Sequence, residues 1–309
     1  MKFSDPISVK TLAEKYNLKI IGDDSLMATG INEIHKVEVG DITFSDVKKY
    51  FKKSLESAAT IILLNEVTEC PPGKVILIAK DPFKVYNSIV TKQRPLRPLS
   101  ANVAITANVH SSAIIEPGVI IGPNVRIGKY SHIQANTVIM EHTIIGDHVT
   151  IQPGTVIGSD AFYYKRGKEG HTKWRSGGRV VIEDHVEIGA LNTINKGVSG
   201  DTIIGEGTKL DCQVHVGHGV VIGKRCLLAA GVLIAGKATI GNDVVLYGAV
   251  GVVQAINIED NVTVLAKTLV NKNLPANKTY NGLPARESTQ RNREIIALKN
   301  LPEFMKKNR

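Results

Sequence analysis

Cysteine is scarce in this chain of 309 residues, which contains only Cys70, Cys212 and Cys226. An odd number of cysteines without metal-ligand spacing argues against both a disulfide framework and a zinc-binding motif. We therefore expect reduced thiols in a cytoplasmic protein. The N-terminal residues MKFSDPISVK lack the apolar core of a signal peptide. The sequence also has no apolar run of about 18 residues, so we expect no membrane-spanning helix.

Aromatic residues and the common nucleotide and hydrolase motifs are also rare. Aromatic residues make up 5% of the chain, with a single tryptophan. The sequence contains no P-loop, no GxSxG motif and no GxGxxG motif opening a helix, which argues against three large enzyme classes. Lysine and arginine outnumber aspartate and glutamate by 38 to 29, a net charge of +9 that suits an acidic partner. No basic run resembles a nucleic-acid-binding arm, so we expect no nucleic acid.

What the sequence does have is a period of six. Twenty-five aliphatic residues recur at steps of six in three runs. These are Val103, Val109, Ile115, Ile121, Ile127, Ile133, Ile139, Ile145, Ile151 and Ile157; Ile182, Ile188 and Ile194; and Ile204, Leu210, Val216, Ile222, Leu228, Ile234, Ile240, Leu246, Val252, Ile258, Val264 and Val270. Neither a helix nor a simple strand has this period, which is typical of a hexapeptide-repeat parallel β-helix.

Three such repeats complete one triangular coil, and the aliphatic residue points into the prism. Coils stack at ~4.8 Å, so twenty-five repeats predict roughly eight coils and a stack on the order of 40 Å long. Glycine, asparagine and aspartate recur between the aliphatic positions, for example at Gly122, Asn124 and Asn136. These residue types suit the unusual backbone angles of tight turns.

Residues 1–98 lack the period and predict a small α/β domain. We expect helices over 8–16, 48–55 and 81–90, and strands over 18–21, 42–44, 59–64 and 74–79. A proline-punctuated linker from Arg94 leads into the β-helix, over 99–274, and a helical tail follows over 275–309. We expect the terminal helix, from Ala285 to Arg309, to break near Pro302 and to cover the open end of the last coil. It carries seven basic and three acidic residues.

Two interruptions of the period predict segments thrown out of the prism. The longer, over 159–180, contains Phe162, Tyr163, Tyr164 and Trp174. A smaller bulge covers 196–200. Insertions in a solenoid emerge on one face, which is often the binding face. We expect the long loop, beginning with Phe162, to contact substrate.

Two histidines, His215 and His218, lie close together in the sequence and are candidates for metal binding or catalysis. His215 and His218 flank the inward Val216 and point out of the prism. Two histidines are too few to hold zinc, although a third from a neighbouring subunit would complete a zinc hydratase site. A neutral imidazole at this position would instead serve as a general base near neutral pH. Gly236 lies one coil, 18 residues, beyond His218, so its unhindered amide would face the same substrate carbonyl.

Six segments give the chain a family resemblance. They are Gly40–Phe44 (GDITF), Ile157–Phe162 (IGSDAF), Gly178–Ile182 (GRVVI), Asp201–Gly205 (DTIIG), Gly217–Gly223 (GHGVVIG) and Asn281–Pro284 (NGLP). In this order, over nearly the whole chain, they resemble the UDP-3-O-(3-hydroxyacyl)glucosamine N-acyltransferases of lipid A biosynthesis, within the hexapeptide acyltransferases. The resemblance implies a left-handed β-helix and a cytoplasmic homotrimer. It also implies an acyl group carried by the phosphopantetheine of acyl carrier protein, with no bound cofactor or metal, and a UDP-linked amino-sugar acceptor.

The resemblance also implies roles for individual residues. It implies that His218 is the general base, that Gly236 supplies the oxyanion-hole amide and that Asp211 is the acidic residue near the catalytic histidine. Phe44 and Tyr50 match aromatics that contact uracil, and Lys272 matches a basic residue near the carrier site. We also count His215 and Phe162 among the substrate contacts.

Three positions depart from the family pattern. Val47 replaces an asparagine between the uracil aromatics, Ala255 replaces a second histidine, and Asn195-Lys196 replaces Asp-Arg near the bulge. These departures allow a divergent paralogue that acylates a related amino sugar, and acyl length is not specified by the sequence. We expect Leu246, Ile256 and Leu269 to line an acyl groove between subunits, and Leu246 is the weakest candidate of the three because the period places it inside the prism.

Other classes remain open at this point. A non-catalytic β-helix scaffold would have no need of His218, and a zinc hydratase would require stoichiometric zinc. Within the transferases, an acyl- or acetyl-CoA-dependent amino-sugar N-acyltransferase is the nearest competitor, although such enzymes rarely carry an additional N-terminal domain.

Overall fold

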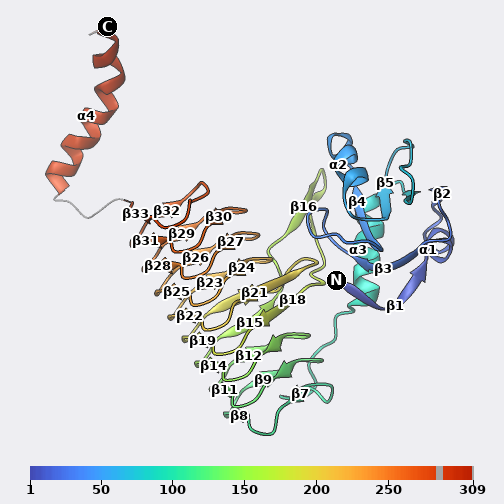
Figure 1. Ribbon diagram of the computed structural model, residues 1–309, viewed down its shortest axis with the longest axis horizontal. Coiled ribbons are helices and arrows are strands. Elements are labelled where there is room, and N and C mark those ends of the chain that lie inside the picture. Colours follow the sequence, from blue (N-terminus) through green and yellow to red (C-terminus); the bar gives the residue numbers. More distant parts are fainter. Residues whose placement is uncertain (283–287, 308–309) are drawn as a thin grey trace.

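The computed structural model describes residues 1–282 and 288–307. Figure 1 shows a small N-terminal domain, a long triangular coil that follows it in the chain, and a C-terminal helix. The N-terminal domain lies beside the upper coils, and a linker descends from it to the first coil (Figure 1). The predicted fold class, a parallel β-helix with an N-terminal α/β domain and a C-terminal helix, is confirmed.

The N-terminal domain is a six-stranded mixed sheet with the order β1-β3-β4-β5-β6-β2. Its strands are β1 (Lys2–Ser8), β2 (Lys19–Gly22), β3 (Met27–Ile31), β4 (Asp41–Ser45), β5 (Ile61–Leu64) and β6 (Val75–Ile78). Its helices are α1 (Val9–Tyr16), the short 3-10 helix η1 (Lys48–Tyr50), α2 (Phe51–Glu56) and α3 (Pro82–Gln93). Every helix and strand expected here is present, whereas β1 and β3 were missed. Both missed strands contain polar and exposed positions that give no apolar run.

The β-helix consists of three parallel sheets that form the sides of the prism. The first contains β7 (Asn108–Val109), β10 (Arg126–Ile127), β13 (Ile144–Ile145), β18 (Arg179–Ile182), β21 (Asp201–Ile204), β24 (Val221–Ile222), β27 (Thr239–Ile240) and β30 (Asn257–Ile258). The second contains β8 (Ile114–Ile115), β11 (His132–Ile133), β14 (Thr150–Ile151), β19 (Glu187–Ile188), β22 (Lys209–Leu210), β25 (Leu227–Leu228), β28 (Val245–Leu246), β31 (Thr263–Val264) and β33 (Thr279–Tyr280). The third contains β9 (Ile120–Ile121), β12 (Val138–Ile139), β15 (Val156–Ser159), β20 (Thr193–Asn195), β23 (His215–Val216), β26 (Leu233–Ile234), β29 (Gly251–Val252) and β32 (Leu269–Val270).

The six-residue period marks the inward positions. In the interior coils the predicted residues are buried, as with Ile234 and Ile258 at 0% exposure, whereas Val103 at the open first coil is 47% exposed. A second inward position precedes each of them by two residues and was not predicted. It carries smaller side chains, such as Val232, Ala238 and Thr155, all fully buried. Each coil therefore buries two rings of side chains.

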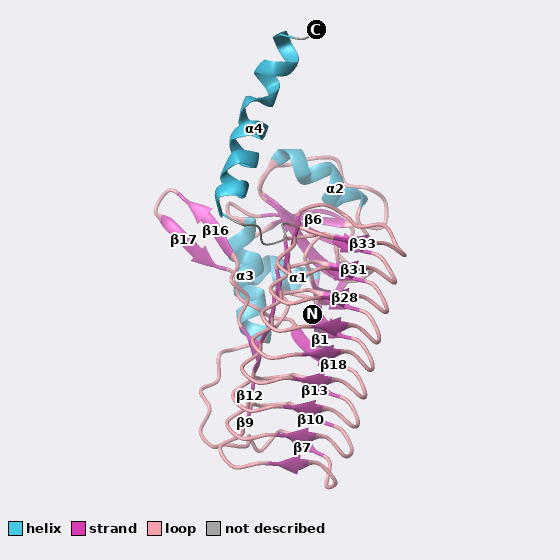
Figure 2. Cartoon of the chain, turned by 90° about the vertical axis from the view of Figure 1, so that its left-hand side faces the viewer, coloured by secondary structure: helices cyan, strands magenta, loops and turns pink. Residues whose placement is uncertain are grey.

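Both interruptions of the period leave the prism at the same edge. The turns that connect the third sheet to the first carry the segment from Asp160 to Gly178 and the bulge 196–200. We call this edge the insertion corner. The longer insertion contains an antiparallel hairpin, β16 (Tyr164–Gly167) and β17 (Gly170–Lys173), which projects to the side of the stack in Figure 2. The predicted excursion is therefore present, and it has secondary structure of its own.

The insertion attaches the N-terminal domain to the coil. The Trp174 ring lies 5.2 Å from the rings of Phe44 and Phe83 and 5.7 Å from that of Tyr86, between centroids. At the base of the insertion, Lys196 is 3% exposed and its Nζ lies 3.1 Å from carboxylate oxygens of both Glu141 and Asp160. The aromatic contacts and the buried ion pairs together hold the insertion between the two bodies.

The C-terminal segment differs from expectation in two respects. Helix α4 (Ser288–Lys307) runs through Pro302 without a break, since a proline removes one backbone donor but does not always end a helix. Figures 1 and 2 show α4 standing away from the last coil, so the expectation that it covers the coil is wrong. Leu274 and Tyr280 pack against that end of the core instead. Residues 283–287, with part of the NGLP motif, and 308–309 lie outside the described residues.

The sequence also predicted that the chain has no membrane-spanning helix and that its cysteines are reduced. Within the described ranges, no helix is long and apolar enough to cross a lipid bilayer. All three cysteines are free thiols, and Cys226 occupies one of the small inward positions of the coil.

The two faces of strand β27 provide a test of the prism core. Ile240 is 1% exposed and its neighbour Thr239 is exposed. Ile240→Ala should lower the free energy of unfolding by about 2–5 kcal/mol, because it leaves a cavity in a stack that cannot collapse locally. Thr239→Ala, the matched control, should change it by about 0.5 kcal/mol or less. Urea unfolding followed by circular dichroism measures both, and equal effects of the two variants would contradict this assignment of faces.

Candidate active site

His218 lies on the insertion corner, directly after strand β23. Val216 is fully buried in the prism, and two residues later the chain turns the corner, which places the His218 side chain outside the core. The side chain is nevertheless covered, because the residue is only 7% exposed. The backbone carbonyl of His218 accepts a hydrogen bond of 2.9 Å from the Lys237 amide of the next coil.

Gly236 lies against the imidazole of His218. Strand β26 pairs with β23 so that Val216 is opposite Ile234, which puts residues 218 and 236 at equivalent places of successive coils. A Cβ on residue 236 would lie 2.5 Å from His218 Nε2, so only glycine leaves room for the ring. The Gly236 N–H makes no hydrogen bond within the described residues. A ring nitrogen and an unused amide therefore occupy the same small region, as the 18-residue step predicts.

Three side chains that the sequence did not indicate cover His218. The Tyr163 ring, from the long insertion, lies 5.0 Å from the His218 ring between centroids. Lys237 Nζ donates to Tyr163 Oη at 3.3 Å and to Glu33 Oε1 at 2.7 Å, and lies 4.6 Å from the Tyr163 ring centroid. Glu33 comes from the N-terminal domain. Residues of the N-terminal domain, the long insertion and the coil therefore lie together over His218.

The electrostatic surroundings of His218 favour a neutral imidazole. Burial lowers the pKa of His218; the negative charge of Glu33 opposes this shift, whereas the positive charge of Lys237 reinforces it. Nδ1 is enclosed and has no hydrogen-bond partner in the part of the chain that the structure describes. A neutral ring can accept a proton, so His218 has the protonation state that a general base requires at neutral pH.

A pocket of about 290 Å³ opens beside this group of residues. Its lining combines the three parts of the fold: Glu33, Ile34, His35, Thr43, Phe44, Ser45, Asp46, Val47, Tyr50, Lys53 and Ser54 of the N-terminal domain, Tyr163 and Trp174 of the insertion, and Lys237 of the coil. Tyr163 and Lys237 thus belong both to this pocket and to the cover over His218. His218 itself does not line the pocket, which borders it through Tyr163 and Lys237.

Phe44 and Tyr50, the predicted uracil contacts, both line this pocket. Tyr50 is 48% exposed, and Lys49 Nζ lies 4.8 Å from its ring centroid. Phe44 is more enclosed, because its ring packs on Trp174 and on Tyr86, with centroids 5.2 and 4.9 Å apart. The indole Nε1 of Trp174 is buried without a hydrogen-bond partner among the described residues. Val47, which replaces the family's asparagine, also lines the pocket and offers no polar group there.

Asp211 lies elsewhere on the same chain. It follows β22, at the corner between the second and third sheets, whereas His218 lies at the corner between the third and the first. Its carboxylate accepts hydrogen bonds from the amide of the adjacent Cys212 at 2.7 Å and from that of Ala230 at 3.1 Å, and the second bond ties this coil to the next. A role beside the catalytic histidine would require an Asp211 from a neighbouring subunit, and it stays a prediction.

The remaining predicted contacts lie around the coil. His215 faces outward from β23, half-buried, and burial lowers the pKa of its imidazole. Phe162 is 86% exposed at the start of the insertion, and Lys272 is exposed just after β32. Leu246 is fully buried and Ile256 is 9% exposed, both in the prism core, so the prediction that they line an outer groove is wrong. Ile256 occupies the second inward position, which the six-residue run did not reveal.

The described residues contain no group of three or more histidine, cysteine, aspartate or glutamate side chains placed to hold a metal ion.

The sequence reasoning missed Glu33, Tyr163 and Lys237 as members of the site. Only Tyr163 had a signal, as one of the four aromatics in the long insertion.

Comparison with known proteins identifies the repeat. A family model for bacterial transferase hexapeptide repeats (six repeats) matches residues 124–159 and 201–236, on either side of the two insertions. Both His218 and Gly236 lie within the second matched segment. The structure of UDP-N-acetylglucosamine acyltransferase from Francisella novicida matches with a TM-score of 0.54 at 28% identity, over 61% of this chain and 69% of that one.

Curated proteins give a similarity at the level of sequence. Over 155 residues, 50% of this chain, the sequence is 43% identical to the UDP-3-O-acylglucosamine N-acyltransferase of Methylorubrum populi, and the match covers 44% of that protein. A protein of the same name from Helicobacter hepaticus is 42% identical over 149 residues, 46% of its length. The matched region thus spans less than half of either relative. The chain is therefore a β-helix protein built of hexapeptide repeats. About half of its length is similar to UDP-3-O-acylglucosamine N-acyltransferases.

Proposed function

We propose that this protein transfers a 3-hydroxyacyl chain from acyl carrier protein to the 2-amine of a UDP-linked 3-O-acylglucosamine. The observation that supports this most directly is the position of His218. Its enclosed, neutral imidazole lies against the unused Gly236 amide, next to a pocket lined by Phe44 and Tyr50. The similarity to enzymes named for this activity supports the same reaction.

The chemistry follows from these two groups. His218 Nε2 takes a proton from the sugar amine as the amine nitrogen attacks the thioester carbonyl carbon. The negative charge that develops on the carbonyl oxygen is stabilised by the Gly236 N–H. When the carbon–sulfur bond breaks, the imidazolium returns the proton to the leaving thiolate, and the products are an amide and the free thiol of the carrier. No covalent enzyme intermediate is needed, and no residue other than His218 changes its protonation state.

The partners follow from charge and from the pocket. The net charge of +9 is complementary to an acidic carrier protein, which would approach the insertion corner from solvent. The uracil ring would stack on Tyr50, with the sugar amine directed past Tyr163 toward His218. We propose a homotrimer in the cytoplasm, in which a neighbouring subunit supplies Asp211 and completes a groove for the acyl chain.

The decisive experiment is an acyl-transfer assay with acyl-carrier-protein thioesters of several chain lengths and UDP-3-O-acylglucosamine. His218→Ala should lower kcat by about 10²–10⁴-fold, the range of a lost general base. His110→Ala is the matched control, because His110 is exposed on the first coil. Full turnover by His218→Ala would remove the assigned base. A wild-type protein that transfers no acyl group to this acceptor would contradict the proposed substrate.

Binding of UDP isolates the nucleotide part of the proposal. Trp174 is the single tryptophan and lines the pocket, so its fluorescence should change saturably as UDP binds. Tyr50→Ala should weaken binding by about 5- to 150-fold, because stacking of a base on an aromatic ring contributes about 1–3 kcal/mol. Tyr130→Ala removes an exposed tyrosine from the coil and should have no effect. Equal affinities for UDP in wild type and Tyr50→Ala would exclude stacking on Tyr50.

The charge on Lys237 provides a test of the His218 pKa that NMR can read without substrate. Because this positive charge lowers the pKa of His218, Lys237→Gln should raise that pKa. The neutral base then appears only at higher pH, so the acidic limb of the pH profile of kcat/KM should move to higher pH as well. NMR titration of the His218 ring, assigned with the His218→Ala variant, measures the shift. Lys209→Gln on the second sheet is the control, and an unchanged or lowered His218 pKa in Lys237→Gln would contradict the prediction.

A further inference from the structure

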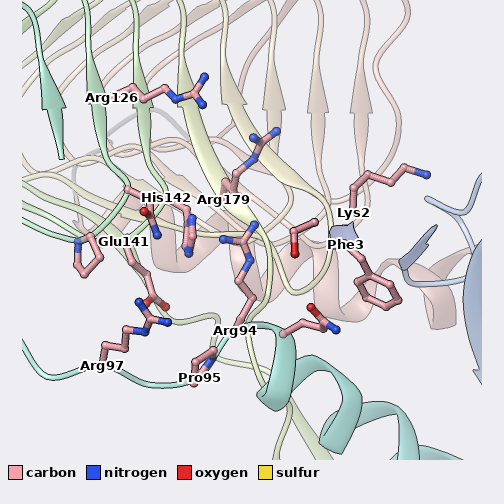
Figure 3. A pocket seen from close by; sticks show the side chains of 13 residues that line it. Lys2, Phe3, Arg94, Pro95, Arg97, Arg126, Glu141, His142 and Arg179 are labelled. Carbon is pink, nitrogen blue, oxygen red and sulfur yellow. The ribbon is translucent and has the colours of Figure 1, made fainter. Parts of the chain in front are cut away.

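A second and larger pocket lies lower on the insertion corner. Its volume is about 620 Å³ and it is bounded by the start of strand β1, the linker after α3, the turns before β10 and β13, and the first residue of β18. Figure 3 shows its labelled side chains, among them Arg94, Arg126 and Arg179. It shares no lining residue with the pocket beside His218. The proposed acyl transfer makes no use of it.

The lining is strongly basic, and part of that charge is already balanced. Lys2 pairs with Asp41, its Nζ lying 2.9 Å from Oδ1, and Arg179 Nη2 lies 2.7 Å from Asp201 Oδ2. The one acidic residue of the lining, Glu141, accepts from Arg175 at 3.2 Å and from Lys196 at 3.1 Å, and neither donor lines the pocket.

Three arginines of the pocket have no such partner. Within residues 1–282 and 288–307, no carboxylate lies within ion-pair distance of Arg94, Arg97 or Arg126. They come from different elements, two from the linker and one from strand β10. The fold therefore brings three guanidinium groups that lack a direct ion-pair partner among the described residues to one concave surface. A cleft lined by charge of one sign attracts a ligand of the opposite charge.

Arg94 is the centre of this arrangement. It is half-buried, and in Figure 3 its guanidinium lies between His142 and Arg179. Burial lowers the pKa of Arg94 and the positive charge of Arg179 reinforces this shift, whereas the negative charges of Glu141 and Asp201 oppose it. Burial and the nearby positive charge of Arg94 lower the pKa of His142 to about 4, so His142 is neutral at physiological pH. An anion placed here would offset the repulsion between Arg94 and Arg179.

We propose that this pocket binds the phosphate or pyrophosphate group of a small molecule, held by Arg94 and Arg126 with Arg97 at the rim. Planar guanidinium groups match the oxygens of phosphate, and several of them lining one cavity suit a multiply charged anion better than a single carboxylate. The site is concave and narrow, which favours a small phosphorylated ligand over a flat protein surface. Because the linker supplies Arg94 and Arg97, a bound anion would join the N-terminal domain, the linker and the lower coils.

Calorimetric titration of the full chain at low ionic strength tests the site with three probes: inorganic phosphate, pyrophosphate and glycerol 3-phosphate. We expect one saturable site per chain, with pyrophosphate bound more tightly than inorganic phosphate. Arg94→Gln and Arg126→Gln should each weaken binding by about tenfold or more, because each removes a charge-assisted hydrogen bond. Tighter binding of glycerol 3-phosphate than of inorganic phosphate identifies a phosphate ester as the natural ligand, and the reverse order identifies the free anion.

Two features of the design separate the site from general charge effects and from unfolding. Arg225→Gln removes one positive charge on the exposed corner between the first and second sheets and should leave the affinity unchanged. Arg126 is exposed, so Arg126→Gln should keep the wild-type circular dichroism spectrum even if Arg94→Gln does not. The proposal is overturned if the wild type shows no saturable binding at millimolar concentration, if Arg126→Gln binds as tightly as the wild type, or if Arg225→Gln loses as much affinity.

Discussion

Hydrogen bonds between strands eighteen residues apart set the spacing of the whole molecule, and the site depends on that spacing. Each strand of the coil pairs in parallel with the one a full turn later, as Val216 does with Ile234. Residues two positions further on, His218 and Gly236, are consequently one coil apart and on the same corner. The catalytic geometry we propose is therefore a property of the stack, which the inward aliphatic residues hold in register.

The second requirement is the attachment of the N-terminal domain. A β-helix alone would leave His218 on an open edge, with nothing to enclose it. The insertion from Asp160 to Gly178 supplies Trp174, which enters the aromatic cluster of the N-terminal domain, and Tyr163, which covers the imidazole. Glu33 then reaches Lys237 across the same boundary. The enclosure that lowers the His218 pKa is thus made by three segments that are far apart in the chain.

The coil was predictable because its signal is repeated many times and each copy specifies the same local structure. Asn124 and Asn136 adopt the left-handed backbone of the turns, as their residue type suggests. Tyr130 and Leu191 adopt the same conformation, with φ of 55° and 57°, without any such signal. In those turns the hydrogen bonds of adjacent coils determine the backbone, and the residue type does not. The second inward position escaped notice for a related reason, because it mixes valine, alanine, threonine and cysteine.

The site was predictable only where it follows the repeat. His218 and Gly236 are one coil apart, so the six-residue period is enough to predict that they lie close together. Glu33 and Lys237 come together only because the folded N-terminal domain docks on the coil, and no local pattern specifies that contact. The same holds for the second pocket, whose arginines come from the linker and from two separate coils. Side chains assembled by docking of distant segments carry no common spacing in the sequence.

The two insertions and the pair His218 and Gly236 share one edge of the prism, and this has a consequence for how the chain can change in length. Adding or removing one residue between positions 218 and 236 would slide one coil against the next and separate the imidazole from the glycine. The tip of the hairpin, between Gly167 and Gly170, bears no such constraint, since it lies outside the hydrogen-bonded stack. Variation in length among natural relatives should therefore gather at the hairpin tip and avoid the seventeen residues between the two proposed catalytic positions.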